Sequence, residues 1–401
     1  MAGPLAGIKV VEFTSVVLGP WACQILGDMG AEVVKVEPPV GDTNRNLGPY
    51  KTNSDMSALY LSCNRNKRSI VLDLKSAEGK KAALKLAASA DVVVHNFRPS
   101  AMDKLGLNYK AIKAVNENVI YCGTYGYSVK GRYGDKGALD DGIQAASGIS
   151  MLMNAVYGEP RYLPTVVADK TTGMAVVNAI TAALFHKERS GEGQEIEVPM
   201  FETMVSWVMA EHAWGHTFEP PLAPAGYVRI MSKGRKPFKT KDGYLSVLPY
   251  WDNHWKTFCG IVERPDMITD PRFPDMKTRL TNVNDMNAAI QEALLPQTTE
   301  EWLKRLEPTN VPHMRVNTLD DLFTDPHLEE SGFWETMEHP TEGTLKMASS
   351  PYNFSRTPTS IRTVPPRLGE NSAEILREAG YSDDDIKTLM LEGVTFEPTN
   401  Q

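Results

Sequence analysis

The sequence has little of what marks secreted or membrane proteins. It contains only four cysteines in 401 residues, and no two of them form a Cys-x-x-Cys pair. Widely separated cysteines are typical of reduced, mostly buried thiols, so we expect a cytoplasmic protein. No apolar run approaches the length of a membrane span, and the first residues resemble neither a signal peptide nor a transit peptide. A membrane partner is therefore not expected.

The chain also lacks an excess of positive charge. Its 42 lysines and arginines stand against 50 aspartates and glutamates, which gives a formal net charge of -8. A nucleic-acid-binding protein usually has a basic surface, so this class of partner is disfavoured. A local basic pocket can still bind an anionic small molecule inside an acidic protein. With 42% hydrophobic residues, a chain of this length predicts a large core and two domains.

The motifs of several common enzyme classes are missing. The first predicted βα turn carries Gly19 but not G-x-G-x-x-G, which argues against an NAD-dependent oxidoreductase. Glu37 is therefore interpreted as a solvated strand end. No P-loop and no G-x-S-x-G elbow occur. His212 and His216 have the spacing of zinc ligands but lack a third ligand, so we expect neither a metal site nor a permanently bound cofactor.

Apolar strand-like segments alternate with segments of helical periodicity in the first half of the chain. The predicted strands span residues 7–13, 31–37, 68–74, 91–97, 118–126 and 191–200, and predicted helices span 19–30, 76–90 and 201–216. Strands that alternate with helices indicate right-handed crossovers and a parallel sheet. The pattern predicts a doubly wound α/β domain.

A proline-rich segment, residues 218–226, interrupts this alternation and predicts a domain boundary. We assign residues 1–220 and 335–401 to a large domain and residues 229–333 to a smaller α+β domain, with linkers at 221–228 and 334. Two helices are expected between residues 364 and 393. Ser382 and the three aspartates after it are a strong start signal for the second.

The stretch PTVVADKTTGM, residues 164–174, places Asp169 before another predicted helix. Apolar residues three or four positions apart give that helix one apolar face: Met174, Val177, Ile180 and Leu184. Aspartate is a preferred N-cap residue, and most aspartates at such positions have only that role. A helix N-terminus also favours the ionised carboxylate, which can act as a covalent nucleophile. The residues alone leave both roles open.

Basic side chains gather around the ends of two predicted strands. Residues 62–75 include Lys75, and residues 95–106 hold Asn96, Phe97, Arg98 and Lys104. Ligands bind at the carboxyl ends of strands in open α/β sheets, and such side chains suit the phosphates of a nucleotide. The alternative is a pair of solvated basic loops. A third basic segment, 232–243, is interpreted as a surface loop that could meet an anionic substrate.

Longer blocks of sequence are more specific. The opening PLAGIKVVEFTSVVLGPWACQILGDMGAEVVKVEPPVGD and the blocks NRNKRSIVLDLK and ADVVVHNFRPSAMDKLGL resemble the family III CoA-transferases. The blocks ADKTTGMAVVNAITAALFHKERSGEGQEIEVPMFETM and LGENSAEILREAGYSDDDI continue the resemblance in the same order. The resemblance covers nearly the whole chain.

This resemblance implies a fold, an activity and a site. The fold would be α/β, with a large Rossmann-like domain whose parallel sheet is built from both chain ends, a smaller α+β domain, and an interlocked homodimer. The activity would be transfer of CoA from an acyl-CoA donor to a carboxylic acid acceptor. Asp169 matches the family's nucleophile, and Asp140 matches an acidic residue near it. The residues that match CoA-contacting segments are Val16, Val17, Leu72, Lys75, Asn96, Phe97, Arg98 and Lys104.

The implied mechanism passes through covalent intermediates on Asp169. Its carboxylate attacks the donor thioester to give a mixed anhydride, and CoA then forms an aspartyl thioester from which it passes to the acceptor. Pro38 stands where the family has a CoA-contacting arginine, so Arg45 or Lys67 is expected to supply that charge. Segment 232–243 lacks the glycine run of members active on formyl-CoA and oxalate, which argues against those two substrates.

Two other functions remain open. An acyl-CoA racemase or epimerase shares the fold but has a histidine before the position of Asp140, where this chain has Leu139. A non-catalytic CoA-binding protein would keep the basic pocket without needing a reactive carboxylate at Asp169. Short dicarboxylates such as succinate are expected substrates if the resemblance extends to substrate choice.

Overall fold

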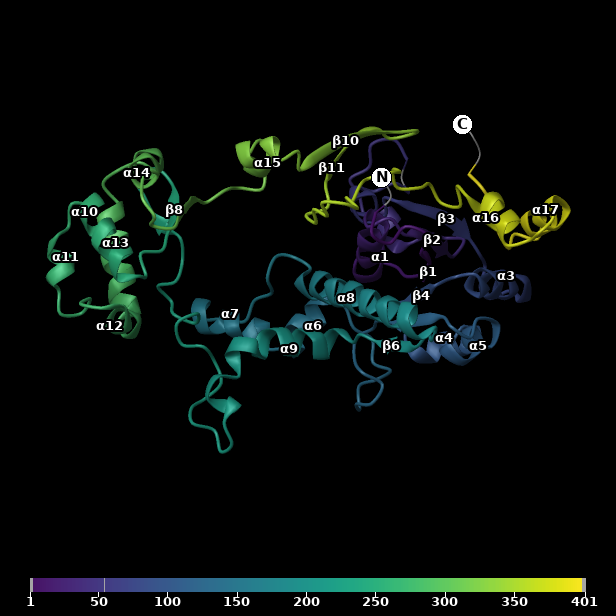
Figure 1. Cartoon of the computed structure of the whole chain (residues 1–401), viewed down its shortest axis with the longest axis horizontal. Helices are drawn as coiled ribbons and strands as arrows, with labels where there is room; N and C mark the ends of the chain where they lie inside the picture. The colour runs from purple at the N-terminus through teal and green to yellow at the C-terminus, as the bar shows by residue number, and fades with distance from the viewer. Residues whose placement is uncertain (1–2, 54, 399–401) are drawn as a thin grey trace. The chain divides into compact units, whose positions relative to one another are not determined.

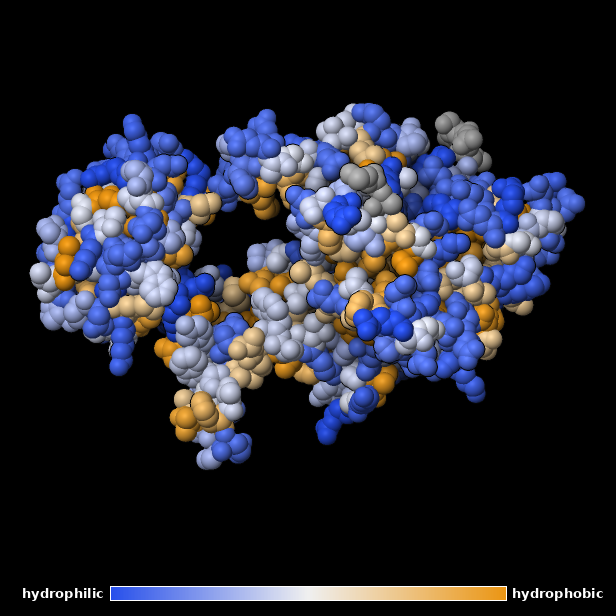
Figure 2. Space-filling model, viewed as in Figure 1, coloured by the Kyte–Doolittle hydropathy of each residue, from blue (hydrophilic) through white to orange (hydrophobic). Residues whose placement is uncertain are grey.

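The computed structural model describes residues 3–53 and 55–398 and divides into two compact units. Unit 1 holds the chain up to Ser147, Leu163–Trp207 and the chain from His327 onward, and unit 2 holds Gly148–Tyr162 and Val208–Pro326. In the view of Figure 2, hydrophilic side chains cover most of the visible surface and hydrophobic ones lie between them in smaller groups. None of the described helices is long and apolar enough to cross a membrane.

Unit 1 is an α/β structure around a six-stranded parallel sheet with the strand order β3-β2-β1-β4-β5-β6 (Figure 1). Its strands are β1 (Lys9–Phe13), β2 (Glu32–Glu37), β3 (Lys67–Val71), β4 (Val92–His95), β5 (Ile120–Gly123) and β6 (Glu195–Glu197). This is the Rossmann order, in which the direction of winding reverses between β1 and β4. The predicted α/β fold class with a parallel sheet is confirmed.

The C-terminal part of the chain joins unit 1 without adding a strand to that sheet. Within the described ranges, every strand of the sheet lies between Lys9 and Glu197, so the expectation of a sheet built from both chain ends is wrong. The late segment instead contributes the antiparallel pair β10 (Trp334–His339) and β11 (Gly343–Ala348) and the helices α16 (Ser372–Glu378) and α17 (Asp383–Leu391). Helix α16 packs against β3.

The remaining helices of unit 1 are α1 (Leu18–Asp28), α2 (Ala58–Cys63), α3 (Ala77–Ala88), α4 (Pro99–Leu105), α5 (Tyr109–Val115), α6 (Asp140–Ala146) and α8 (Val167–Ser190). Of these, α1, α3 and α8 correspond to helices that the sequence predicts, whereas α2, α4, α5 and α6 were not predicted. Helix α9 (Met200–His212) continues into unit 2, and α15 (Pro326–Glu330) leads back out of it. Ser76 and Ser382 cap α3 and α17 with their side chains, and the cap at Ser382 is the one that the sequence predicts.

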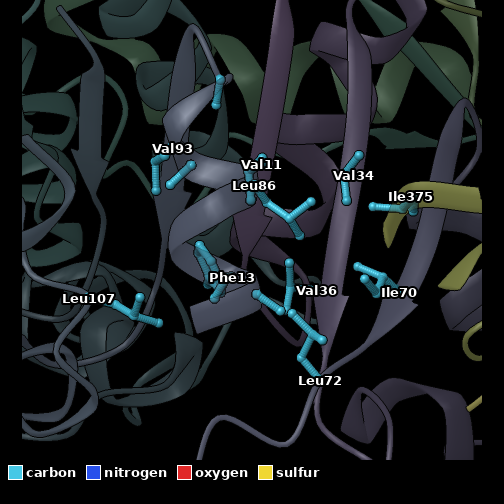
Figure 3. Close-up of a cluster of buried hydrophobic side chains, with 14 of the residues drawn as sticks. Val11, Phe13, Val34, Val36, Ile70, Leu72, Leu86, Val93, Leu107 and Ile375 are labelled. Atoms are coloured by element: carbon cyan, nitrogen blue, oxygen red, sulfur yellow. The ribbon is translucent and has the colours of Figure 1, made fainter. Parts of the chain in front are cut away.

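One face of the sheet carries the main apolar cluster of unit 1. Alternate residues of neighbouring strands point to this face, including Val11 and Phe13 of β1 and Val34 and Val36 of β2 (Figure 3). Residues of α3, α5, α16 and α17 cover them. Leu72, which follows β3, is fully buried in the same cluster.

The opposite face carries charged residues although it is also buried. Glu12, Lys35 and Glu37 occupy the alternate positions of β1 and β2, and each is at most 2% exposed. Helices α1 and α8 pack together and contact the strands on this side. Glu37 is therefore not the solvated strand end that the sequence indicated. Buried charges persist only when they are paired. Lys35 pairs with Glu12 and Asp42, and Glu37 pairs with Arg45.

Unit 2 is a smaller α+β structure with its own core. A three-stranded antiparallel sheet of β7 (Phe238–Lys239), β8 (Tyr244–Val247) and β9 (His313–Arg315) packs with helices. The helices are α7 (Ile149–Tyr157), α10 (Asp252–Ile261), α11 (Asp266–Thr269), α12 (Met276–Thr281), α13 (Val283–Leu294) and α14 (Thr299–Leu306), with 3-10 turns η2 (Trp214–Thr217) and η3 (Asp321–Phe323). Trp255 and Trp302 anchor the core.

Candidate active site

A cavity of about 1110 Å³ opens at the carboxyl ends of β1, β4 and β5. Residues that follow these strands form one part of its wall: Ser15, Val16, Asn96, Phe97, Arg98, Thr124, Tyr125, Gly126 and Tyr127. Asp169 from α8 and Lys136 from the loop before α6 also line the cavity. All of these residues belong to unit 1. Because the winding reverses between β1 and β4, this is the place where an open α/β sheet binds its ligand.

The loop after β1 is held in a strained conformation at the cavity wall. Val16 has a φ of 69°, which is unfavourable for a β-branched residue and costs about 1 to 3 kcal/mol. Asp42 accepts a hydrogen bond from the Val16 N–H at 3.1 Å, and the Asn44 side chain donates to the Val16 carbonyl at 2.6 Å. Val17 follows as the buried N-terminal flank of α1 and does not line the cavity.

Asn96 ties the loop after β4 to the loop after β1. Its side chain donates to the Ser15 carbonyl at 2.8 Å and accepts from the Ser15 N–H at 3.1 Å. Phe97 and Arg98 come next and line the cavity, with Arg98 exposed. The structure thus brings together four of the residues matched to CoA-contacting segments, namely Val16, Asn96, Phe97 and Arg98.

The other matched residues lie outside the cavity wall. Lys75, just after β3, and Lys104, in the last turn of α4, are both exposed. They remain predictions as CoA contacts. Leu72 packs its side chain into the core, so the structure gives that side chain a packing role.

Arg45 and Lys67 are not available to replace the charge missing at Pro38. Arg45 is fully buried and forms a two-bond ion pair with Glu37, at 2.7 and 2.8 Å. Burial opposes the charge on Glu37, but Arg45 outweighs this and lowers the pKa of Glu37 to about 2. Lys67 is 3% exposed and pairs with Glu12 at 2.8 Å. The expectation that either of them contacts CoA is wrong, because both charges are already neutralised inside the protein.

Asp169 lies in the first turn of α8 but is not its N-cap. The helix begins at Val167 after Val166, so Asp169 is the third helical residue. The apolar face of α8 also differs from the prediction, since Met174 is 47% exposed while Val177 and Ile180 are buried.

The Asp169 carboxylate occupies an unusual electrostatic environment. The residue is 8% exposed, and burial together with the nearby Asp140 charge raises its pKa to about 7. Within the described ranges, no hydrogen bond holds its side-chain oxygens. A buried carboxylate without donors and beside a second anion, in the wall of a cavity, is a candidate functional group.

Asp140 supplies the cap that Asp169 does not. It is the first residue of α6, and its Oδ1 accepts hydrogen bonds from the backbone N–H groups of Ala168 and Asp169 at 2.7 and 3.0 Å. These are two of the free donors at the start of α8. Asp140 itself is 7% exposed. The two aspartates therefore have different tasks, because one stabilises the helix start and the other faces the cavity.

Three cavity residues and one supporting residue were missed at the level of sequence. Tyr125 and Tyr127 were included in or next to a strand predicted to end at residue 126, whereas β5 ends at Gly123. The repeated glycines after this point signal a loop and could have revealed it. Lys136 adds a second cation to the cavity wall. Gln144 is buried behind Asp140 and carries no motif that sequence alone would identify.

The residues considered for a metal do not form a site. His212 accepts a hydrogen bond from the Tyr227 backbone through its Nδ1 at 3.1 Å. Across the part of the chain that the structure describes, no group of three or more His, Cys, Asp or Glu side chains is arranged to hold a metal ion. The four cysteines are free and buried.

Comparison with known proteins agrees with this geometry. The chain matches the family model described as CoA-transferase family III over residues 5–372. It is 32% identical to human succinyl-CoA:glutarate CoA-transferase over 98% of this chain and 90% of that protein. It is 33% identical to succinate--glutarate CoA-transferase of Agrobacterium fabrum, over 94% of this chain and 95% of that one.

Solved structures give the same assignment. A CAIB/BAIF family protein from Brucella suis superimposes with a TM-score of 0.81 and 30% identity, over 94% of this chain and all of that one. Rv3272 from Mycobacterium tuberculosis also gives a TM-score of 0.81 and 30% identity, over 93% of this chain and 99% of that one. The chain therefore belongs to CoA-transferase family III and is a transferase enzyme.

Proposed function

We propose that this enzyme transfers CoA from an acyl-CoA thioester to a free carboxylic acid, with Asp169 as the nucleophile. The observation that carries the proposal is a buried, unbonded carboxylate in the wall of a cavity at the switch point of the sheet. A cavity of about 1110 Å³ is large enough for a substantial part of an acyl-CoA molecule. Two cationic side chains, Arg98 and Lys136, stand in the same wall and suit its phosphates.

The reaction needs no group beyond these residues and the substrates. An Asp169 oxygen attacks the thioester carbonyl carbon, the C–S bond breaks, and CoA leaves as thiolate. The thiolate attacks the Asp169 carbonyl carbon and displaces the donor acid as a carboxylate. The acceptor carboxylate then displaces CoA to form a second anhydride, and the returning thiolate releases acceptor acyl-CoA and free Asp169. Burial of Asp169 limits hydrolysis of these intermediates by water.

The identity of the acids follows from the named relatives only as a proposal. Both transferases reported above use succinate and glutarate derivatives, so we propose short dicarboxylic acids as donor and acceptor. Leu139, which lines the cavity, offers no acid or base at the position where a racemase would need one. A panel of acyl-CoA donors against free acids tests this choice. Deuterium uptake at the acyl α-carbon without CoA transfer would instead identify a racemase.

Removing a cation from the cavity wall is expected to weaken CoA binding. Arg98→Ala and Lys136→Ala should each raise the Kd for CoA about tenfold at low salt, because each removes a charge-assisted hydrogen bond to phosphate. Titration calorimetry at two salt concentrations measures the change, and the salt dependence should also fall. Lys110→Ala is the control, since Lys110 is exposed and lies outside the cavity wall. Unchanged affinity in both cavity variants would show that CoA binds elsewhere. Lys75→Ala and Lys104→Ala test the two exposed lysines in the same way.

We also propose that two chains interlock as a homodimer, as the family resemblance implies. Threaded chains cannot separate without unfolding. Tagged and untagged dimers, purified separately and mixed under native conditions, should therefore form no mixed dimer over many hours. Native mass spectrometry detects mixed dimers directly. Rapid exchange, or dissociation to monomers on dilution, would exclude the interlocked arrangement.

A further inference from the structure

Gln144 connects the two catalytic segments through a buried side chain. It lies on α6, one turn after Asp140, and is 0% exposed. Its Nε2 donates to Asp140 Oδ2 at 2.6 Å and to the Thr165 carbonyl at 3.3 Å. Its Oε1 accepts from the Leu163 N–H at 2.9 Å. The Gln144 amide thus joins the start of α6 to the segment that leads into α8.

The polarity of these bonds allows only one arrangement. The Leu163 N–H can only donate, so it fixes the oxygen of the Gln144 amide and turns the nitrogen toward Asp140. Asp140 must then accept at Oδ2, while its Oδ1 already accepts from two backbone N–H groups of α8. Both oxygens of Asp140 are acceptors, and neither has a hydrogen-bond partner to which it could donate a proton.

We propose that Gln144 is a positioning residue that fixes Asp140 as a helix cap and as a negatively charged neighbour of Asp169. Asp140 then acts through its charge and its bonds to α8, without transferring a proton. This proposal rests on the proposed role of Asp169 as the nucleophile. The charge of Asp140 disfavours the free Asp169 anion, and that repulsion disappears when Asp169 becomes a neutral anhydride or thioester. Repulsion that is relieved on reaction favours acylation.

The other charged groups around Asp169 do not offset this repulsion. Arg98, Lys136 and Asp141 share the cavity wall but are exposed to solvent. Lys170, the next residue along α8, donates to Thr165 Oγ1 at 2.7 Å. From α2, Cys63 is close enough to be influenced by Asp169, and burial raises the pKa of its thiol to about 11, so it is neutral near pH 7. Asp140 is therefore the neighbour whose charge acts on Asp169.

An exchange of the two side-chain types separates the role of the charge from that of the hydrogen bonds. In Asp140→Asn alone, an amide NH2 faces the NH2 of Gln144. In Gln144→Met, Asp140 Oδ2, the Leu163 N–H and the Thr165 carbonyl all lose the bond to Gln144. The double variant Asp140→Asn/Gln144→Glu restores the pairing between positions 140 and 144 with donor and acceptor exchanged, and it keeps the bond from the Leu163 N–H. It gives up only the longer bond to the Thr165 carbonyl, at 3.3 Å. It also moves the negative charge away from the bonds to α8. Gln24→Met is the matched control, since Gln24 is a buried glutamine that accepts from a backbone N–H at 3.1 Å.

Three measurements decide the proposal. Urea midpoints at pH 8 report stability, and unfolding with and without Asp169→Asn across pH 5 to 9 reports the pKa of Asp169. The rate of covalent acylation by an acyl-CoA reports reactivity. We expect the double variant to recover the midpoint lost by Asp140→Asn, to titrate Asp169 at lower pH than the wild type, and to acylate at least about tenfold more slowly.

Each contrary result overturns the proposal. Failure of the double variant to exceed the midpoint of Asp140→Asn would contradict the assigned bond polarity. Recovery of both midpoint and acylation rate would reduce Asp140 and Gln144 to structural residues. An equal loss of rate in Gln24→Met would remove the special role of Gln144. If wild-type protein is not acylated at all, the proposed function fails. The urea midpoints and the pKa of Asp169 still test whether Gln144 positions Asp140.

Discussion

Replacing Asp169 with asparagine is expected to lower CoA transfer by at least about 10³-fold while the protein still folds. An amide is a far poorer nucleophile than a carboxylate, and the rest of the cavity wall stays in place. The bonds that start α8 go to the backbone of Ala168 and Asp169, so they do not depend on the substituted side chain.

The wild type also permits a direct test of the covalent step. Given an acyl-CoA donor and no acceptor, it should gain mass on the peptide that contains Asp169, and hydroxylamine should release the adduct. Asp141→Asn is the matched control, because Asp141 is an exposed acid of the same cavity wall and should retain both transfer and labelling. An Asp169→Asn variant that folds and turns over at a tenth of the wild-type rate would rule the nucleophile out, since that rate corresponds to only about 1.4 kcal/mol of barrier.

The regular part of the fold could be predicted because its signals are local. Strands with alternating apolar residues and helices with serine caps are written in short stretches, as at Ser76 and Ser382. The position of the site also followed, because the carboxyl ends of parallel strands meet at one edge of the sheet. The sequence therefore predicted that residues 96 to 98 lie at this edge of the sheet, where they line the cavity.

The buried charges could not be predicted because the fold, rather than a local sequence pattern, brings their partners together. Lys67 pairs with Glu12, 55 residues away, and Glu37 pairs with Arg45 inside the protein. A local pattern shows a charge at a strand end but not whether a partner covers it. The sequence therefore offered Lys67 and Arg45 as ligands for CoA, whereas the fold uses them to neutralise acids beneath the strained loop at Val16.

The same limit applies to the start of α8. Sequence rules assign the cap to the nearest suitable side chain, which is Asp169. In the structure the cap is Asp140, which is not part of α8. It lies 28 and 29 residues before the two N–H groups that it binds. Because Asp140 caps the helix, the Asp169 carboxylate is not needed for capping. The chemistry of the site thus depends on a long-range contact that no local pattern contains.

The ionisation of Asp169 makes the wild type less stable as pH rises, so Asp169→Asn is expected to be the more stable protein above neutral pH. The unfolded chain ionises Asp169 near its ordinary pKa of 3.8, whereas the folded protein keeps the proton up to about pH 7. Between these values the unfolded state binds fewer protons than the folded state, so stability falls with rising pH. The three-unit difference corresponds to about 4 kcal/mol at most, and we expect a gain of about 1 to 4 kcal/mol for the variant above pH 7.

Urea unfolding of the two proteins across the pH range measures this difference. The advantage of Asp169→Asn should be close to zero at pH 4, grow between pH 4 and 7, and remain constant above that range. Asp141→Asn should show no such growth, because its carboxylate is exposed. A difference that does not change with pH would mean that the fold leaves the pKa of Asp169 at its ordinary value, and an advantage that shrinks as pH rises would mean that Asp169 is stabilised as an anion in the fold. A carboxylate that the fold stabilises as an anion would be a structural group. A reactive carboxylate instead lowers the free energy of unfolding of its protein when it ionises, as we expect for Asp169.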